Sequence, residues 1–154
     1  MQIRIEATAL PGRHCPAGPG FPGASDIHVG VQRKDRPAEL LGLLPADAPS
    51  AVWTLDCTAV PGPDGIALRG PYLQNRLGGR FVYLSWLAAD GAGGLAMFRR
   101  AKLMLDAVTP ATLAAAVEGG RLTARLGLTD SAGLPLCAAV RPPLISWSAG
   151  PDPA

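Results

Sequence analysis

Apolar residues at every second position are the strongest pattern along the chain, and this period predicts β-strands. Two early strands are expected, with the apolar residues Ile3, Ile5, Ala7, Ile27, Val29 and Val31. In the second of these, the intervening positions would form a polar face of His28, Gly30 and Gln32. Between the two strands, residues 11–23 hold four prolines and four glycines, which predicts a long loop without regular structure.

A third strand is expected at residues 51–60, where the same alternation continues. Trp53 and Leu55 lie on its apolar face, together with Cys57 and Ala59. The turn-forming residues 61–65 are expected to end it, because two prolines and two glycines occur within five positions.

Residues 81–86 follow a different pattern, because they are apolar on both faces except at Ser85. Such a strand is typical of the centre of a sheet that is covered on both sides. The glycine-rich segment 90–94 then predicts a turn, so that residues 81–86 and 97–105 would pair as a hairpin.

Residues 97–105 fit two structures. A helix would group Met97, Ala101, Met104 and Val108 on one side. A strand would turn Ala101, Leu103 and Leu105 inward, and would turn outward Phe98, Arg100, Lys102 and Met104. The strand is favoured, because the segment that follows has a helix start of its own.

That helix is expected near residues 110–118. Thr109 is a good N-cap, Pro110 suits the first helical position, and Leu113 and Val117 give an apolar stripe. Glycine at 119 or 120 would end the helix.

Two further strands are expected at residues 121–129 and 136–140, separated by a turn at 130–133. The prolines at 142 and 143 cannot donate to a ladder, so residues 144–147 would form an edge strand or a packed tail. The expected fold class is therefore mainly β, at the margin of α+β: an antiparallel β-sandwich or small barrel with one short helix near 110–118. A single domain would span residues 1–148, with a disordered tail at 149–154.

Composition excludes several classes of function. A net charge of +2 is too small for a nucleic-acid-binding footprint, and no apolar run approaches the ~20 residues of a membrane span. The start MQIRIEA alternates apolar and charged residues, unlike a signal peptide, so we expect a cytoplasmic protein. The oligomeric state is left open by the sequence.

Metal and thiol chemistry are not indicated. The two histidines, His14 and His28, lie far apart, so we expect no metal and no cofactor. A nucleophilic Cys15 beside His14 is possible in principle, but adjacent residues rarely have the required geometry. Cys15, Cys57 and Cys137 are odd in number and widely spaced, which favours free thiols.

The densest group of cations lies in residues 69–105, which contain a single acidic residue, Asp90. The cations are Arg69, Arg76, Arg80, Arg99, Arg100 and Lys102. A Gly-Pro turn would place Arg69, Tyr72 and Gln74 near one another, and the guanidinium fork suits a carboxylate or phosphate. Arg100 and Lys102 would project from the same strand face. The sequence therefore predicts a ligand site with Arg69, Tyr72, Gln74, Arg100 and Lys102, although a solvated surface explains the same residues.

Several segments resemble a family of small, uncharacterised proteins of high-GC actinobacteria, known as a domain of unknown function. They are MQIRIEA, HVGVQR, GRFVYLSW, MFRRAKLMLDAV and RLTARLGLTDSAGLPLCAAVRPP. The likeness runs from Met1 to about Trp147, apart from residues 11–23 and 61–65. It implies a single-domain protein, and it implies no activity, cofactor or catalytic residue.

Three functions stay open at this stage. The first is a module that binds a small anionic ligand or an acidic protein partner. The second is a cofactor-free enzyme, such as a cyclase or isomerase of specialised metabolism, that holds its substrate in an apolar pocket. The third is a protein–protein adaptor that uses an exposed sheet edge. A barrel with an aromatic mouth would favour the enzyme, and a sandwich with a basic face would favour the other two.

Overall fold

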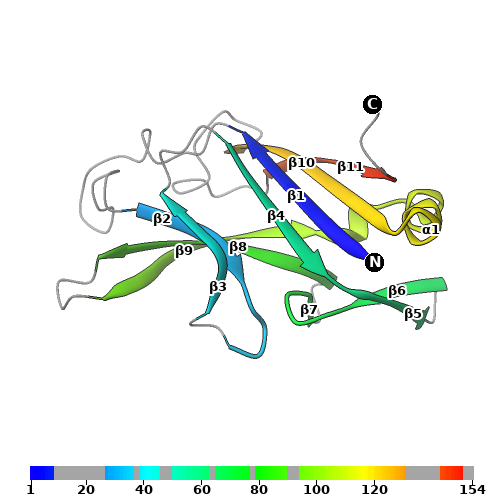
Figure 1. Cartoon of the computed structure of the whole chain (residues 1–154), viewed down its shortest axis with the longest axis horizontal. Coiled ribbons are helices and arrows are strands. Elements are labelled where there is room, and N and C mark those ends of the chain that lie inside the picture. Colours follow the sequence, from blue (N-terminus) through cyan, green and yellow to red (C-terminus); the bar gives the residue numbers. More distant parts are fainter. Residues whose placement is uncertain are drawn as a thin grey trace.

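The computed structural model describes residues 1–8, 27–36, 39–45, 50–62, 65–76, 79–89, 94–130 and 143–150. Their strands form a four-stranded sheet, a five-stranded sheet and a separate two-stranded hairpin (Figure 1). The predicted mainly-β fold class is confirmed, and none of the sheets built by these residues closes into a barrel. The fold is therefore the sandwich of the two alternatives.

The four-stranded sheet has the order β11-β10-β1-β4. Its strands are β1 (Gln2–Thr8), β4 (Ser50–Asp56), β10 (Arg121–Asp130) and β11 (Pro143–Ala149). The predicted alternation holds in β1, where Ile3, Ile5 and Ala7 are buried. β1 pairs antiparallel with β4 but parallel with β10, a direction that alternation within a single strand cannot reveal.

The five-stranded sheet has the order β3-β2-β8-β7, and β9 pairs with the other side of β8. Its strands are β2 (Ile27–Gln32), β3 (Leu40–Pro45), β7 (Gln74–Arg76), β8 (Gly79–Ala89) and β9 (Leu95–Met104). The predicted hairpin of β8 and β9 is confirmed, and the helical alternative for residues 97–105 is wrong. Gln32, expected on a polar face, is buried, because β2 lies between β3 and β8 and the amide bonds to Ser85.

The strand predicted at residues 51–60 is interrupted at Cys57 and continues as β5 (Thr58–Gly62). The pairing of β4 with β1 ends at the pair Asp56–Gln2. The next residue, Cys57, donates its backbone N–H to the Met1 carbonyl at 3.1 Å. The chain then pairs with β6 (Gly65–Arg69) to form the separate hairpin. The predicted turn at 61–65 is correspondingly shorter, because residues 61, 62 and 65 belong to the ladder.

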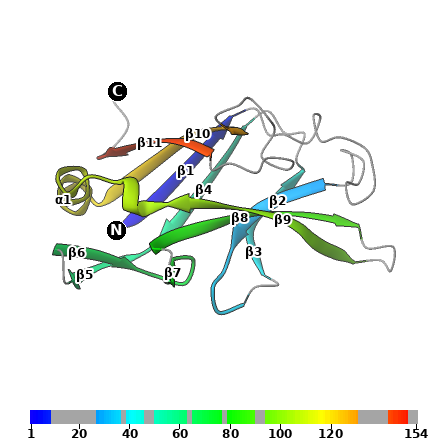
Figure 2. The same ribbon diagram turned by 180° about the vertical axis from the view of Figure 1, so that it is seen from behind.

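A short 3₁₀ helix, η3 (Leu105–Ala107), leads from β9 to α1 (Pro110–Gly119), as the view from behind shows (Figure 2). The predicted helix signals are confirmed. The Thr109 hydroxyl accepts the Thr112 N–H at 3.2 Å, Pro110 is the first helical residue, and Gly120 ends the helix at φ +76°. α1 has ten residues, and the described part of the chain holds no helix with the length and apolarity needed to cross a membrane.

The core lies between the two large sheets. The four-stranded sheet contributes Ile3, Ile5, Trp53, Leu55, Leu122 and Ala124, and the five-stranded sheet contributes Val29, Val31, Val82, Leu84, Trp86 and Leu103. Trp53 links the sheets directly, because its indole N–H donates to the Gly42 carbonyl of β3 at 2.9 Å. Gly42 has φ +60°, and a Cβ there would lie 2.7 Å from the indole ring, so the approach requires glycine.

Several predicted features lie outside the described residues: the loop at 11–23, the turns at 90–94 and 130–133 in large part, and the strand at 136–140. β11 lies at the edge of its sheet, which confirms the edge-strand prediction for 144–147. β11 ends at Ala149, and the Gly150 N–H bonds to the Arg121 carbonyl at 3.0 Å, so the paired strand extends past residue 148. Residues 151–154 lie outside the described part.

Replacing Trp86 with Ala should lower the free energy of unfolding by about 3–5 kcal/mol, because it leaves a cavity at a fully buried position. Chemical denaturation measures the loss. Val52→Ala is the control: Val52 is half exposed on the outer face of β4, so its removal should leave stability within about 0.5 kcal/mol. Equal losses in the two variants would contradict the assignment of Trp86 to the core.

Candidate functional site

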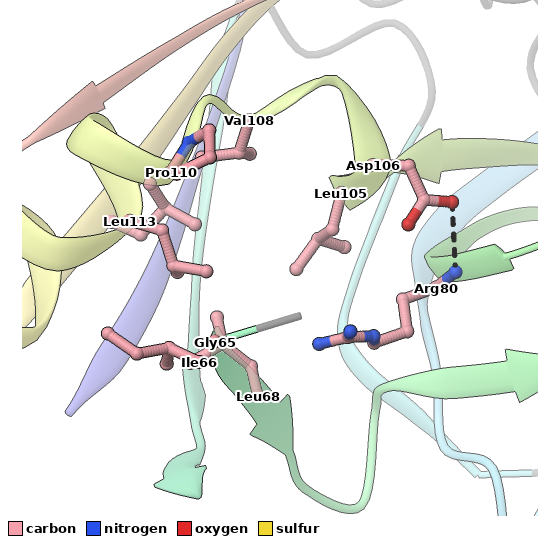
Figure 3. A pocket seen from close by; sticks show the side chains of 10 residues that line it. Gly65, Ile66, Leu68, Arg80, Leu105, Asp106, Val108, Pro110 and Leu113 are labelled. Carbon is pink, nitrogen blue, oxygen red and sulfur yellow. Dashed lines mark hydrogen bonds between the residues drawn. The ribbon is translucent and has the colours of Figure 1, made fainter. Parts of the chain in front are cut away.

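A pocket of about 350 Å³ lies at one end of the sandwich, where the β5–β6 hairpin faces η3 and the start of α1 (Figure 3). It is lined by Gly65, Ile66, Leu68, Arg80, Leu105, Asp106, Val108, Pro110, Leu113 and Leu122. Leu68, Leu105 and Leu122 also belong to the core, so the pocket continues the apolar interior at an open end. Most of the lining side chains are therefore aliphatic, and two are charged.

The chain builds this corner from local signals. β9 ends at Met104, η3 supplies Leu105 and Asp106, and the Thr109 cap starts α1 two residues after η3 ends. The two successive changes of direction hold η3 and α1 over the hairpin. In Figure 3 the aliphatic side chains of Ile66 and Leu113 lie on one side of the pocket, and Arg80 enters it from the other side.

Arg80 is the cation of the pocket. It shares the inner face of β8 with Val82 and Leu84, and it is the first residue of that face. Its guanidinium points into the space between Leu68 and Leu105 (Figure 3). The guanidinium group makes no hydrogen bond or ion pair with any residue in the described ranges, although it is always charged. The pocket thus holds a half-buried positive charge that forms no ion pair with those residues.

Asp106, the other charged lining residue, is engaged with the backbone. Its carboxylate accepts the Arg80 N–H at 3.2 Å, at the start of β8. The preceding Gly79 has φ +106°, and a Cβ at this position would overlap the Asp106 carboxylate. Gly79 and Asp106 therefore form a close contact that fixes the start of β8 against η3 and so positions Arg80.

Three of the five predicted site residues lie on the outer face of the large sheet, away from the pocket. Arg100 and Lys102 are exposed there on β9, whereas Gln74, opposite Phe81 on β7, is buried. The Arg100 guanidinium lies 4.5 Å from the ring centroid of Tyr83, and the Lys102 ammonium lies 4.6 Å from that of Phe81. We call Gln74, Phe81, Tyr83, Arg100 and Lys102 the basic–aromatic face.

The other two predicted residues lie elsewhere. Arg69 is exposed at the end of β6, opposite Thr58 in the hairpin. Tyr72 is half-buried against the core, in a turn whose Pro71 carbonyl accepts the Lys34 N–H at 2.7 Å. This turn is held to the loop after β2. The Gly-Pro turn therefore does not bring Arg69, Tyr72 and Gln74 to one surface.

Sequence reasoning did not select Arg80, although it lies in the cationic cluster. The alternation of side chains along β8 could have identified it. Arg80 lies two residues before Val82 and four before Leu84, so it is expected on the same inner face. The aromatic residues Phe81 and Tyr83 were likewise read only as part of a buried strand. That they lie beneath Arg100 and Lys102 follows from the pairing of β8 with β9.

Metal and thiol chemistry find no support in the described part of the chain. It contains no group of three or more His, Cys, Asp or Glu residues that could hold a metal ion. His14, Cys15 and Cys137 lie outside it. Cys57 is unbridged and buried, and burial raises the pKa of its thiol, which disfavours the reactive thiolate.

Fold and site together define a mainly-β sandwich domain with an apolar, arginine-containing pocket at one open end. The chain belongs to the Family of unknown function (DUF5990), whose model matches residues 1–150. The resemblance inferred from the sequence is thus confirmed at the level of an uncharacterised family. Comparison with curated proteins finds no match, and comparison with solved structures finds none either.

Gly79→Ala should cost about 1–3 kcal/mol more in unfolding free energy than Gly120→Ala, because only at Gly79 would the new Cβ overlap a neighbouring group. Gly120 is the matched control, since it also has a positive φ but has open space around it. Chemical denaturation gives both values. In an Asp106→Ala background most of the excess should disappear, with the Met104 side chain 3.3 Å from the new Cβ as the remaining close neighbour, and an excess of unchanged size would show that Asp106 is not the group in contact.

Proposed function

We propose that the protein binds a small organic anion with an apolar body in the Arg80 pocket. The observation that carries the proposal is the Arg80 guanidinium, which projects between aliphatic side chains into the pocket and forms no ion pair with the described residues, while the Asp106 carboxylate of the lining is bonded to a backbone N–H. A charge that is partly removed from water gains most from a charged acceptor, and guanidinium presents parallel donors that match a carboxylate.

The pocket favours a small carboxylic acid over a larger or more highly charged ligand. Its volume of about 350 Å³ lies near the lower end of the range of about 300–1,000 Å³ found for small-molecule sites. The lining includes one cation among the described residues, and the Asp106 carboxylate at its edge would repel a doubly charged phosphate. Ile66, Leu105 and Leu113 would contact the apolar body.

Binding is favoured over catalysis by the chemistry of the lining. The ten described residues that line the pocket include no serine, cysteine, histidine or lysine. The one carboxylate among them, that of Asp106, accepts a hydrogen bond from a backbone N–H. None of the sheets formed by the described residues closes into a barrel, the form that would favour a cyclase or isomerase. We place the protein in the cytoplasm, a setting that suits the unbridged Cys57.

The test compares acids with alcohols of the same shape. Hexanoate and benzoate should bind wild-type protein, measured by titration calorimetry, and hexanol and benzyl alcohol should bind at least about tenfold more weakly. Arg80→Gln should reduce the affinity for the acids about 10- to 100-fold and leave that for the alcohols unchanged, because one charge-assisted interaction is worth about 1.5–3 kcal/mol.

Arg36→Gln is the matched control. Arg36 is exposed in the loop between β2 and β3, where it pairs with Glu39, so its loss removes the same charge away from the pocket. Leu113→Ala should weaken acids and alcohols alike, because it removes apolar contact only. Equal affinities for acid and alcohol, or an unchanged acid affinity in Arg80→Gln, would overturn the proposal.

A further inference from the structure

We propose that the basic–aromatic face docks an extended acidic segment of a partner protein, in which carboxylates occur at alternate positions. The face lies on the side of the five-stranded sheet that is turned away from the core, whereas Arg80 belongs to the inner side. This inference is therefore independent of the small ligand proposed for the pocket.

The two cations of the face are held in place by the rings beneath them. Phe81 and Tyr83 pack edge to face with their centroids 4.8 Å apart, and Phe81 is fully buried. Arg100 covers Tyr83 and Lys102 covers Phe81, each at cation–π distance. Both long side chains have therefore lost part of their conformational freedom before any partner binds, which lowers the entropic cost of docking.

Both cations remain available to an anion. They are exposed, and neither forms an ion pair with a carboxylate of the described residues. A cation over a ring uses one side of the charged group for the ring, and its other side faces solvent. A surface with two such cations and no facing carboxylate among the residues described is complementary to negative charge.

The spacing of the two cations matches that of alternate side chains in an extended peptide. Arg100 and Lys102 are alternate residues of β9, roughly 6.6–7 Å apart along the strand. Alternate side chains of an extended peptide have the same spacing, so two carboxylates of one segment can meet both cations at once. The net charge of +2 argues against nucleic acid as the partner.

The experiment uses a fluorescein-labelled nine-residue peptide in which Glu alternates with Thr, and a second peptide with Gln in place of every Glu. Fluorescence anisotropy with the full chain should show binding of the Glu peptide that weakens as salt is raised, and little binding of the Gln peptide. The double variant Arg100→Gln with Lys102→Gln should bind the Glu peptide about tenfold more weakly. Arg100→Lys should retain most of the affinity, because it keeps the charge.

The control is the double variant Lys34→Gln with Arg36→Gln. It removes the same two charge types at the same spacing, from the exposed loop after β2. It should leave peptide binding unchanged, and both double variants should keep the melting temperature and hexanoate affinity of the wild type. Tyr83→Leu should weaken the Glu peptide while every charge is kept, because it frees Arg100 from its ring.

Three results would overturn the inference. Equal binding of the Glu and Gln peptides would show that charge is not recognised. Equal losses in the two double variants would show a response to net charge and not to this face. Binding of a single-stranded DNA oligonucleotide through Arg100 and Lys102, with no binding of the Glu peptide, would assign the face to nucleic acid.

Discussion

The alternation of side chains along β8 is the constraint on which the rest of the structure depends. On its inner side Val82, Leu84 and Trp86 fill the core, and Arg80 continues that side into the pocket. On its outer side Phe81 and Tyr83 support the cations of β9. A slip of one residue would exchange the two sides, which would put Phe81 at the pocket and Arg80 under the cations. The pairs that Phe81 makes with Gln74 and with Met104 hold the register from both edges.

On a strand that is buried on both faces, a polar side chain depends on neighbouring strands for its partner; the Trp86 indole N–H finds none among the described residues, whereas Ser85 does. Ser85 is the polar exception in the run 81–86, and its hydroxyl donates to the Gln32 side chain at 3.2 Å on the adjacent strand β2. Both side chains are buried, and a lone hydroxyl in that position would cost about 1–3 kcal/mol. Gln32 is therefore buried as the partner of Ser85. Its position on the polar side of an alternating strand predicted that Gln32 would be exposed to solvent. The prediction failed because a pattern within one strand contains no information about the neighbouring strand.

The sequence predicted the elements of this fold better than their arrangement. Strand period, the Thr109 cap and the glycine at 120 are local signals, and each was correct because neighbouring residues alone determine it. The parallel pairing of β1 with β10 and the departure of β5 from the first sheet depend on which strand is available as a partner. For the same reason Arg100 and Lys102 were correctly placed together, since one strand carries both. Arg69 and Tyr72 were grouped with them through the Gly-Pro turn and the hairpin that follows it; the hairpin forms, but Arg69 lies on β6 and Tyr72 is half-buried against the core.

The cationic cluster of residues 69–105 is thus a feature of the sequence that the fold divides. Arg80 points into the end of the sandwich, Arg100 and Lys102 lie on its outer surface, and Arg69 lies on the hairpin. Separation reduces the repulsion between like charges, and it leaves each cation in a different environment. Arg100 and Lys102 are compensated by aromatic rings and by water, whereas Arg80 has neither ring nor carboxylate against its guanidinium among the described residues. The guanidinium without an ion pair or a ring contact is therefore also the one that lies between aliphatic side chains. For that reason the small amphipathic anion is proposed for the pocket, and the acidic segment for the exposed face.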